Sequence, residues 1–149
     1  LTGLCNRRLF DETLTTEYAR AYREQYPITL FMIDIDNFKY LNDTHGHATG
    51  DELLRELGKE LRRELRPYDC AARWGGDEFL VLLSSCDIER LDFICTRLRE
   101  KIRHNEKFSQ YGITASTGAA LSRDNDSYED VIARSDTSLY HAKSAKKSG

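Results

Sequence analysis

The sequence predicts an α/β fold of the α+β kind, with a mixed central sheet that is flanked by helices and includes a β-hairpin. Helix-like segments, with apolar residues three or four positions apart, alternate with short apolar runs rich in β-branched residues. Two of these runs flank Gly75-Gly76-Asp77-Glu78, a glycine-led turn that indicates the hairpin. Since helices interleave with strands while one strand pair is a hairpin, the sheet is expected not to be all-parallel.

The first half of the chain is expected to hold a helix, a strand and a second helix. Residues 7–23 predict a helix that ends before Pro27. The run from Ile28 to Ile35 predicts a strand buried on both faces, since it is short and apolar throughout. Residues 51–65 predict a helix whose first turn carries Asp51 and Glu52, where carboxylates suit the helix dipole. The residues expected on the apolar stripe of the first helix are Leu9, Phe10, Leu14, Tyr18 and Tyr22.

The second half is expected to hold the hairpin, two helices and one further strand. The hairpin strands are residues 70–74 and 79–83, and a helix over residues 88–102 follows. A strand of small residues is expected over 112–121, and a last helix over 127–146 opens with a Ser127/Asp130 capping pattern. That last helix is expected to bury Val131, Ile132, Leu139 and Tyr140.

Composition and charge exclude several classes of protein. The chain has 149 residues, room for one domain, with 40% hydrophobic and 32% charged residues, which is typical of a globular fold. Its net charge of −3 argues against a general nucleic-acid surface. The longest apolar run, residues 28–33, is too short to cross a bilayer, and no signal peptide opens the chain. Its four cysteines lack zinc-site spacing, so they are expected to be thiols in a reducing cytoplasm.

Carboxylates gather at two turns of the predicted sheet. Asp34 and Asp36 close the first strand, while Asp77 and Glu78 form the tip of the hairpin. If those strands are neighbours, the acids meet, and such a cluster is unfavourable unless a cation neutralises it. Oxygen ligands without nearby His or Cys favour Mg²⁺ or Mn²⁺. For any single acid the alternative is a solvated turn residue; for the acids together the metal site is favoured.

Six ordered blocks spread over nearly the whole chain resemble those of the GGDEF-type diguanylate cyclases. The resemblance therefore implies one GGDEF domain over residues 1–149, with a sheet similar to the palm of nucleotide cyclases and polymerases. It also implies a piece of a longer sensory protein, located in the cytoplasm unless an absent upstream part anchors it. The blocks are Leu1-Thr-Gly-Leu-Cys-Asn-Arg-Arg8, Asp34-Ile-Asp-Asn-Phe-Lys39, Asn42-Asp43, Gly46-His47-Ala-Thr-Gly-Asp51, Arg73-Trp-Gly-Gly-Asp-Glu-Phe79 and Asp136-Thr-Ser-Leu-Tyr-His-Ala-Lys143.

By this resemblance the protein is expected to condense two GTP molecules into cyclic di-GMP and two pyrophosphates. The family uses two divalent ions, which activate a 3′-hydroxyl and stabilise the leaving oxygens. The implied metal ligands are Asp34, the backbone carbonyl of Ile35 and Asp77. Glu78 is the candidate general base or second-metal ligand, two roles that the sequence does not separate. Gly75 and Gly76 are expected to permit a tight turn and a close approach of the nucleotide.

The same resemblance implies a set of substrate contacts. Guanine carries N–H donors, and the acceptors expected to meet them are Asn42 and Asp51, with His47 beside them. The alternatives are a turn residue for Asn42, a helix cap for Asp51 and a turn filler for His47. Triphosphate binding is expected of Lys39 and Lys143. Where the family continues with Gly, Arg and Asn, this chain has Lys146, Lys147 and Ser148; Lys147 keeps the charge of the arginine without its bidentate fork.

A second nucleotide site and a homodimer are also implied. Arg66-Pro-Tyr-Asp69 matches the Arg-x-x-Asp with which active members bind the product as an inhibitor; the alternative is a helix-terminal arginine beside a turn aspartate. The symmetric product requires two domains facing each other, each holding one GTP. The main alternative function is a binding module that holds GTP or cyclic di-GMP to regulate a neighbouring domain. A polymerase-like enzyme acting on nucleic acid is disfavoured by the charge and the length.

Overall fold

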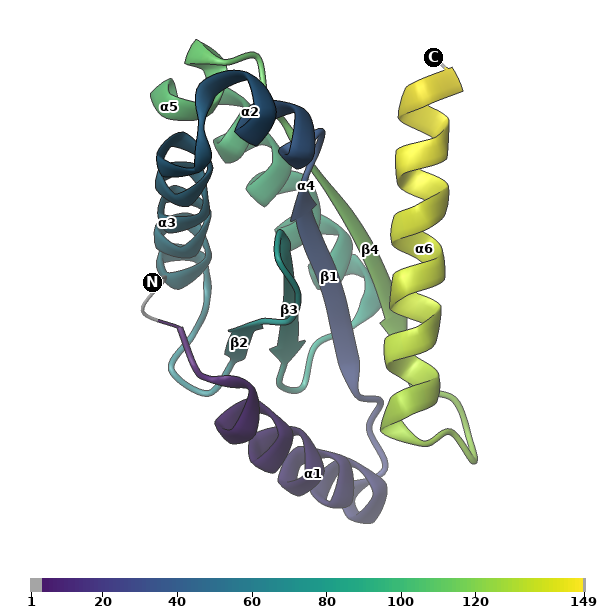
Figure 1. Cartoon of the computed structure of the whole chain (residues 1–149). Coiled ribbons are helices and arrows are strands. Elements are labelled where there is room, and N and C mark those ends of the chain that lie inside the picture. Colours follow the sequence, from purple (N-terminus) through teal and green to yellow (C-terminus); the bar gives the residue numbers. More distant parts are fainter. Residues whose placement is uncertain (1–3, 149) are drawn as a thin grey trace.

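The computed structural model describes residues 4–148, with side chains described as far as residue 146. Four strands form one sheet in the order β2-β3-β1-β4, and all three neighbouring pairs are antiparallel. The predicted class is confirmed, because helices flank this sheet and the glycine turn joins β2 to β3 (Figure 1). The elements are α1 (Arg7–Glu24), β1 (Thr29–Ile35), α2 (Phe38–His45), α3 (His47–Glu64), β2 (Cys70–Arg73), β3 (Glu78–Leu83), α4 (Ile88–His104), α5 (Glu106–Gln110), β4 (Ala115–Leu121) and α6 (Tyr128–Ser148).

The sheet is covered on both faces, which explains why β1 is buried along its whole length. Side chains alternate between the faces of a strand. Phe31, Ile33 and Ile35 therefore pack in a core with α3 and α4, whereas Leu30 and Met32 pack in a second core with α1 and α6. Figure 1 shows α6 running along β4 on one side of the sheet and α3 on the other. By the same alternation, the side chain of Asp34, two residues after Met32, lies on the face covered by α6.

Two helix beginnings have the capping that their sequences predict or allow. Ser127 and Asp130 form the expected reciprocal pair before α6, since the Ser127 amide donates to the Asp130 carboxylate at 2.9 Å and the Asp130 amide to Ser127 Oγ at 3.2 Å. The Asn6 side chain accepts from the amide of Leu9 at 2.8 Å and caps α1.

The expected boundaries are wrong between β1 and α3. Helix α2 was not expected, and α3 begins at His47 rather than at Asp51. Gly46 explains the break, because its φ of +89° separates the two helices and is a conformation that favours glycine. Asp51 consequently lies inside α3, so its alternative as a helix cap is excluded. The short helix α5 was likewise not expected.

Some residues of the predicted apolar stripes face solvent instead. Leu9 is 47% exposed, Tyr22 83% and Tyr140 68%. In α1 the sheet-facing stripe passes through Phe10, Leu14 and Ala21, so the larger Tyr22 lies beside it rather than on it. The spacing of aromatic residues along a helix was therefore not enough to predict which of them are buried and which lie beside the buried face.

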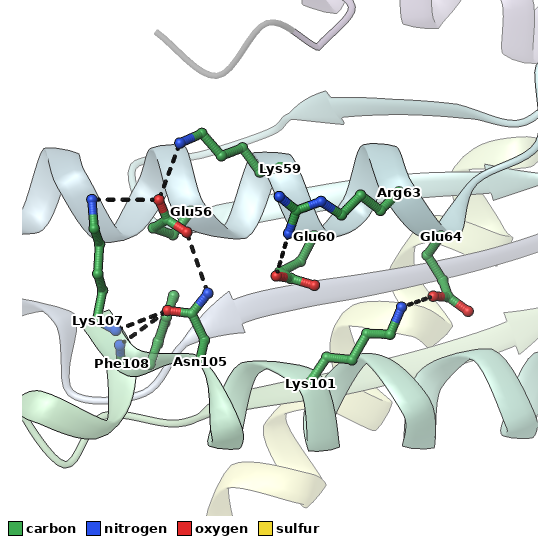
Figure 2. Close-up of polar contacts among 9 residues, drawn as sticks. All are labelled: Glu56, Lys59, Glu60, Arg63, Glu64, Lys101, Asn105, Lys107 and Phe108. Carbon is green, nitrogen blue, oxygen red and sulfur yellow. Dashed lines mark hydrogen bonds and ion pairs between the residues drawn. The ribbon is translucent and has the colours of Figure 1, made fainter.

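Helix α3, which carries Asp51, has three half-buried or buried carboxylates spaced four residues apart, and two of them, Glu56 and Glu64, connect it to α4, α5 and the residue between those helices. Figure 2 shows them on α3, with Lys101, Asn105 and Lys107 reaching toward Glu56 and Glu64 from the neighbouring segment. Glu56 accepts from Asn105 and Lys59, both at 3.2 Å, and these contacts outweigh the effect of burial and lower the pKa of Glu56. Glu60 pairs with Arg63 at 2.9 Å, and Glu64 with Lys101 at 2.9 Å and Arg97 at 3.2 Å. The network fixes α3 relative to the rest of the domain.

Candidate active site

The end of β1 and the glycine turn meet, as the sequence predicts. Asp34 is paired with Glu78 in the sheet, and the amide of Ile35 donates to the carbonyl of Asp77 at 3.4 Å. Paired residues of neighbouring strands point to the same face. The carboxylates of Asp34 and Glu78 therefore share the α6 face, with Asp77 adjoining them.

Asp34 is a buried carboxylate, and among the residues whose side chains are described one cation, Lys143, lies close to it. Its side chain is on the sheet, 5% of the residue is exposed, and its Oδ1 lies 2.5 Å from Lys143 Nζ on α6 without accepting a well-formed hydrogen bond. Burial raises the pKa of Asp34 to about 6, an effect that the Lys143 ammonium opposes and that the Asp77 and Asp36 carboxylates reinforce. Negative charge at this point is thus undercompensated by the protein itself.

Asp36 is buried like Asp34 but is fully engaged. Its Oδ1 accepts from Ser116 Oγ and its Oδ2 from Thr114 Oγ1, both at 2.7 Å. Lys146 Nζ lies 2.8 Å from Oδ2. The pKa of Asp36 is lowered overall, because burial acts to raise it but the contacts with Lys146, Thr114 and Ser116 outweigh that effect. Asp36 is therefore a counter-ion for α6 rather than a free ligand for a metal.

The donor set fits a hard divalent ion that shares its ligands with a phosphate. Within the part of the chain that the structure describes, no three His, Cys, Asp or Glu side chains could hold a metal by themselves. Mg²⁺ is commonly bound by one or two carboxylates, with waters and substrate phosphates completing its shell. The buried, poorly partnered oxygen of Asp34, together with Asp77 and the Ile35 carbonyl, suits that arrangement.

A cavity of about 570 Å³ lies beside these acids and contains the basic residues expected to meet phosphate. It extends from the end of β1 to α6. Its lining includes Asp77, Lys39 and Lys143, which the sequence predicts, and also Asp36 and Lys146. Lys147, a further predicted phosphate contact, has a side chain outside the described residues. The described lysines place positive charge around a hollow large enough for a polyphosphate.

Glu78 also borders a second cavity, of about 520 Å³, between α1 and α6. Trp74 and Asp136 line this cavity too. Burial, followed by the charges of Asp136 and Asp77, raises the pKa of Glu78, while Lys143 lowers it. A carboxylate with a raised pKa is a better proton acceptor at neutral pH than an ordinary one.

The glycine turn is stabilised by a residue that the sequence did not single out. The Arg73 guanidinium donates to the carbonyl of Gly76 at 2.6 Å and to that of Gly75 at 3.3 Å. Glycine was expected to permit a tight turn here, but the backbone of this turn does not demand it. Neither glycine has a positive φ; a Cβ at Gly76 would meet nothing within 4 Å, and at Gly75 only Glu78, at an ordinary 3.5 Å. Open space at the tip leaves room for a close approach of a ligand.

The predicted guanine contacts lie on the neighbouring helix pair. Asn42 is on α2, and its buried Oδ1 has no hydrogen-bond partner among the described residues. Asp51 lies one turn into α3, half-buried, and His47 is exposed at the first residue of that helix. Gly50 allows the two helices to meet here, because a Cβ on it would lie 1.9 Å from Asn42 Oδ1. The structure thus supplies an unused acceptor at Asn42.

Arg66 and Asp69, the predicted inhibitory site, are bound to each other. Asp69 has only 1% of its side chain exposed; it accepts from the Arg66 amide at 2.9 Å and from the Ser84 amide at 3.0 Å. Arg66 contacts Asp69 Oδ2 at 3.3 Å and donates to the Ser84 carbonyl at 2.7 Å. The guanidinium, 26% exposed, lies over the Tyr68 ring. The Arg66–Asp69 pair connects the turn before β2 to the end of β3, and this link is present without any ligand.

Comparison with known proteins identifies relatives over the full length. The family model "Diguanylate cyclase, GGDEF domain" matches residues 1–149. The chain is 38% identical to diguanylate cyclase DgcS of Shewanella oneidensis over 97% of its own length and 49% of that relative. It is 40% identical to diguanylate cyclase DgcP of Pseudomonas aeruginosa over 97% of this chain and 22% of DgcP. The chain thus spans about half or less of these curated relatives.

A solved structure has the same fold. The GGDEF domain of DgcB from Caulobacter crescentus, crystallised in complex with c-di-GMP, superposes with a TM-score of 0.89 at 32% identity, covering 97% of this chain and 88% of that one. Within the described residues, none of the helices combines the length and the apolar character needed to span a membrane.

Proposed function

This chain belongs to the diguanylate cyclase GGDEF domain family, and on that premise we propose that it condenses two GTP molecules into cyclic di-GMP, as one half of a homodimer. The observation that carries the proposal is the buried Asp34 oxygen near Asp77 and Glu78, next to a cavity that is lined by Asp77 and three lysines. Family membership and the names of the relatives support it.

In the proposed reaction, each domain holds one GTP and presents it to the partner. The 3′-hydroxyl oxygen of one GTP attacks the α-phosphorus of the other, forming a P–O bond, while the bond to the β-phosphate oxygen breaks and pyrophosphate leaves. The hydroxyl proton passes to Glu78, whose raised pKa suits it as acceptor. Repeating the step with the roles exchanged closes the ring, which is why two facing domains are required.

Asp34, Asp77 and the Ile35 carbonyl would hold Mg²⁺ or Mn²⁺, and such an ion would compensate the charge of the buried Asp34 carboxylate.

When bound, such an ion would neutralise the developing charge on pyrophosphate and lower the pKa of the attacking hydroxyl. The protein's own residues would do the rest of the work. Lys39 and Lys143 would hold the triphosphate, and Asn42 and Asp51 would accept hydrogen bonds from the guanine edge. Gly75 and Gly76 would leave room for the nucleotide, because they carry no side chain and the space around them is not filled by the protein.

The test is product formation by the chain fused to a dimerising coiled coil, incubated with GTP and Mg²⁺. Fusion raises the effective concentration of the facing domains. We expect cyclic di-GMP from the wild type, none above background from Asp77→Ala, and a wild-type rate from Asp124→Ala, an exposed acid between β4 and α6. GTP binding without product would instead favour the binding module.

We also propose that the product inhibits by binding at Arg66 and Asp69. The exposed part of the Arg66 guanidinium and the Tyr68 ring beneath it offer a charged and a stacking surface. Arg66→Ala should abolish product inhibition. Tyr68→Ala, which keeps the Arg66–Asp69 pair, should weaken product inhibition. Unchanged inhibition in Arg66→Ala would leave the pair a purely structural connection.

A further inference from the structure

Lys146, near the end of α6, reaches back to the sheet beside the candidate active site. Its Nζ lies 2.8 Å from Asp36 Oδ2 and 2.8 Å from the carbonyl oxygen of Ala115. These two acceptors lie at the end of β1 and the start of β4. Lys146 also lines the 570 Å³ cavity together with Lys39, Lys143 and Asp77. Its side chain is 44% exposed, so the residue is not enclosed by the protein.

The contact between Lys146 and Asp36 is exchangeable. If the ammonium leaves, Asp36 keeps the hydroxyl of Ser116 on one oxygen and that of Thr114 on the other, both at 2.7 Å. A buried carboxylate that loses all of its donors is strongly unfavourable, but this one retains two. Lys146 can therefore move to a stronger anion without leaving Asp36 unsatisfied.

Lys143 has less freedom than Lys146. Its ammonium lies between Asp34, at 2.5 Å, and Asp36, at 3.5 Å. Lys143 and Lys146 are three residues apart on α6, so both side chains leave the same face of the helix. The two ammonium groups consequently border one cavity, one of them held by the buried Asp34 and the other resting on a carboxylate that can release it.

We propose that Lys146 is a triphosphate-binding residue, which rests on Asp36 and Ala115 in the free protein and transfers to the phosphates when nucleotide binds. This inference rests on the proposed function in taking GTP as the ligand. The family pattern has a glycine at this position, which has no side chain for such a contact. The contact is thus a property of this chain, and it adds a cation next to Lys147, the residue that stands where the pattern has an arginine.

The test measures binding of 3′-deoxy-GTP, which lacks the attacking hydroxyl, by isothermal titration calorimetry at constant Mg²⁺. Lys146→Met keeps length and apolar volume but removes the charge, and Lys146→Arg restores a charge. Arg8→Ala is the matched control, because it removes one positive charge from a side chain that is 90% exposed on α1. GMP serves as the second ligand, since it has the guanine and ribose without the β- and γ-phosphates.

We expect Lys146→Met to weaken 3′-deoxy-GTP binding about tenfold, the loss of one charge-assisted contact, and GMP binding by less than about twofold. Lys146→Arg should recover most of the affinity, and Arg8→Ala should leave it unchanged. Unchanged or tighter binding in Lys146→Met would overturn the proposal, as would an equal loss for 3′-deoxy-GTP and GMP, which indicates a structural role. A wild type that binds no 3′-deoxy-GTP would overturn it together with the proposed function.

The two proposals fail separately in the remaining cases. A wild type whose binding depends on Lys146 but which forms no cyclic di-GMP contradicts the proposed function and supports the role of Lys146. If the wild type forms cyclic di-GMP while Lys146→Met binds 3′-deoxy-GTP normally, the proposed function is supported and the role of Lys146 is contradicted. Thermal unfolding of Lys146→Met, compared with that of the wild type, shows whether the variant remains folded in the binding assay.

Discussion

Replacing Gly118 by alanine should disturb the site from a distance. Gly118 lies on β4, opposite Met32 of β1, and faces α6. A Cβ there would lie 2.1 Å from the amide nitrogen of Leu139 and 2.4 Å from the carbonyl oxygen of Ser135. Both atoms belong to the backbone of α6, so no side-chain rotation relieves the overlap. The helix itself has to move.

The size of the movement follows from ordinary contact distances. A Cβ atom normally lies no closer than about 3.4 Å, so the Leu139 backbone must retreat by roughly 1.3 Å. Overpacking of this kind destabilises a protein by about 1–3 kcal/mol, or about 3–10 °C in Tm for a domain of this length. Lys143 lies one helical turn beyond Leu139, and its 2.5 Å contact with Asp34 would be lost. A displacement of about 1 Å in a site lowers rates by about a hundredfold.

The assay combines chemical denaturation with product formation by the dimerised chain. We expect Gly118→Ala to lower the denaturation midpoint with an unchanged m-value and to reduce cyclic di-GMP formation by about a hundredfold at temperatures where the variant is folded. A variant with wild-type stability and rate would refute the reasoning, because α6 would then not depend on this close approach to β4.

Three further predictions concern single groups of the site. Burial raises the pKa of Asp34 to about 6, so ionisation of Asp34 destabilises the metal-free fold as the pH rises above the unfolded-state pKa. In denaturation experiments with a chelator, Asp34→Asn should therefore be about 1–3 kcal/mol more stable than the wild type near pH 8, and this gain should shrink toward about pH 4. A gain in stability that does not depend on pH would contradict this account. Gly50→Ala should displace the Asn42 amide, because its Cβ would lie 1.9 Å from Oδ1; competition binding should register a loss of about tenfold in preference for GTP over ATP, and an unchanged preference would exclude Asn42 from guanine recognition. Gly76→Ala should unfold within about 1 °C of the wild type, since its Cβ meets nothing within 4 Å, yet turn over slowly in the product assay; full activity would mean that the nucleotide does not approach this backbone.

The two acidic strand ends could be predicted because each depends on a local pattern, whereas their meeting was expected only if the two strands were neighbours. A short apolar run ending at Asp34 and a glycine-led turn before Glu78 each define a strand end, and neighbouring strands bring those ends together. The errors have physical causes as well. Tyr22 and Tyr140 share helical spacing with core residues but lie on the flank of their helices. Helix α2 has one fully buried residue, Leu41, with Phe38 partly buried against the same core, and a single such pair is too short a pattern to predict a helix.

The fold class, the hairpin with its acidic turn and the family could be predicted from the sequence alone, since each depends on patterns of residues close together along the chain. Three contacts could be seen only in the folded molecule: Lys146 resting on Asp36, Thr114 and Ser116 sharing that carboxylate, and Gly118 admitting α6 to the sheet. Periodicity specifies which face of an element is apolar, but it carries no information on how closely two distant backbones approach. That approach is set by packing of α6 on β4, and it places the lysines of α6 at the acids of β1.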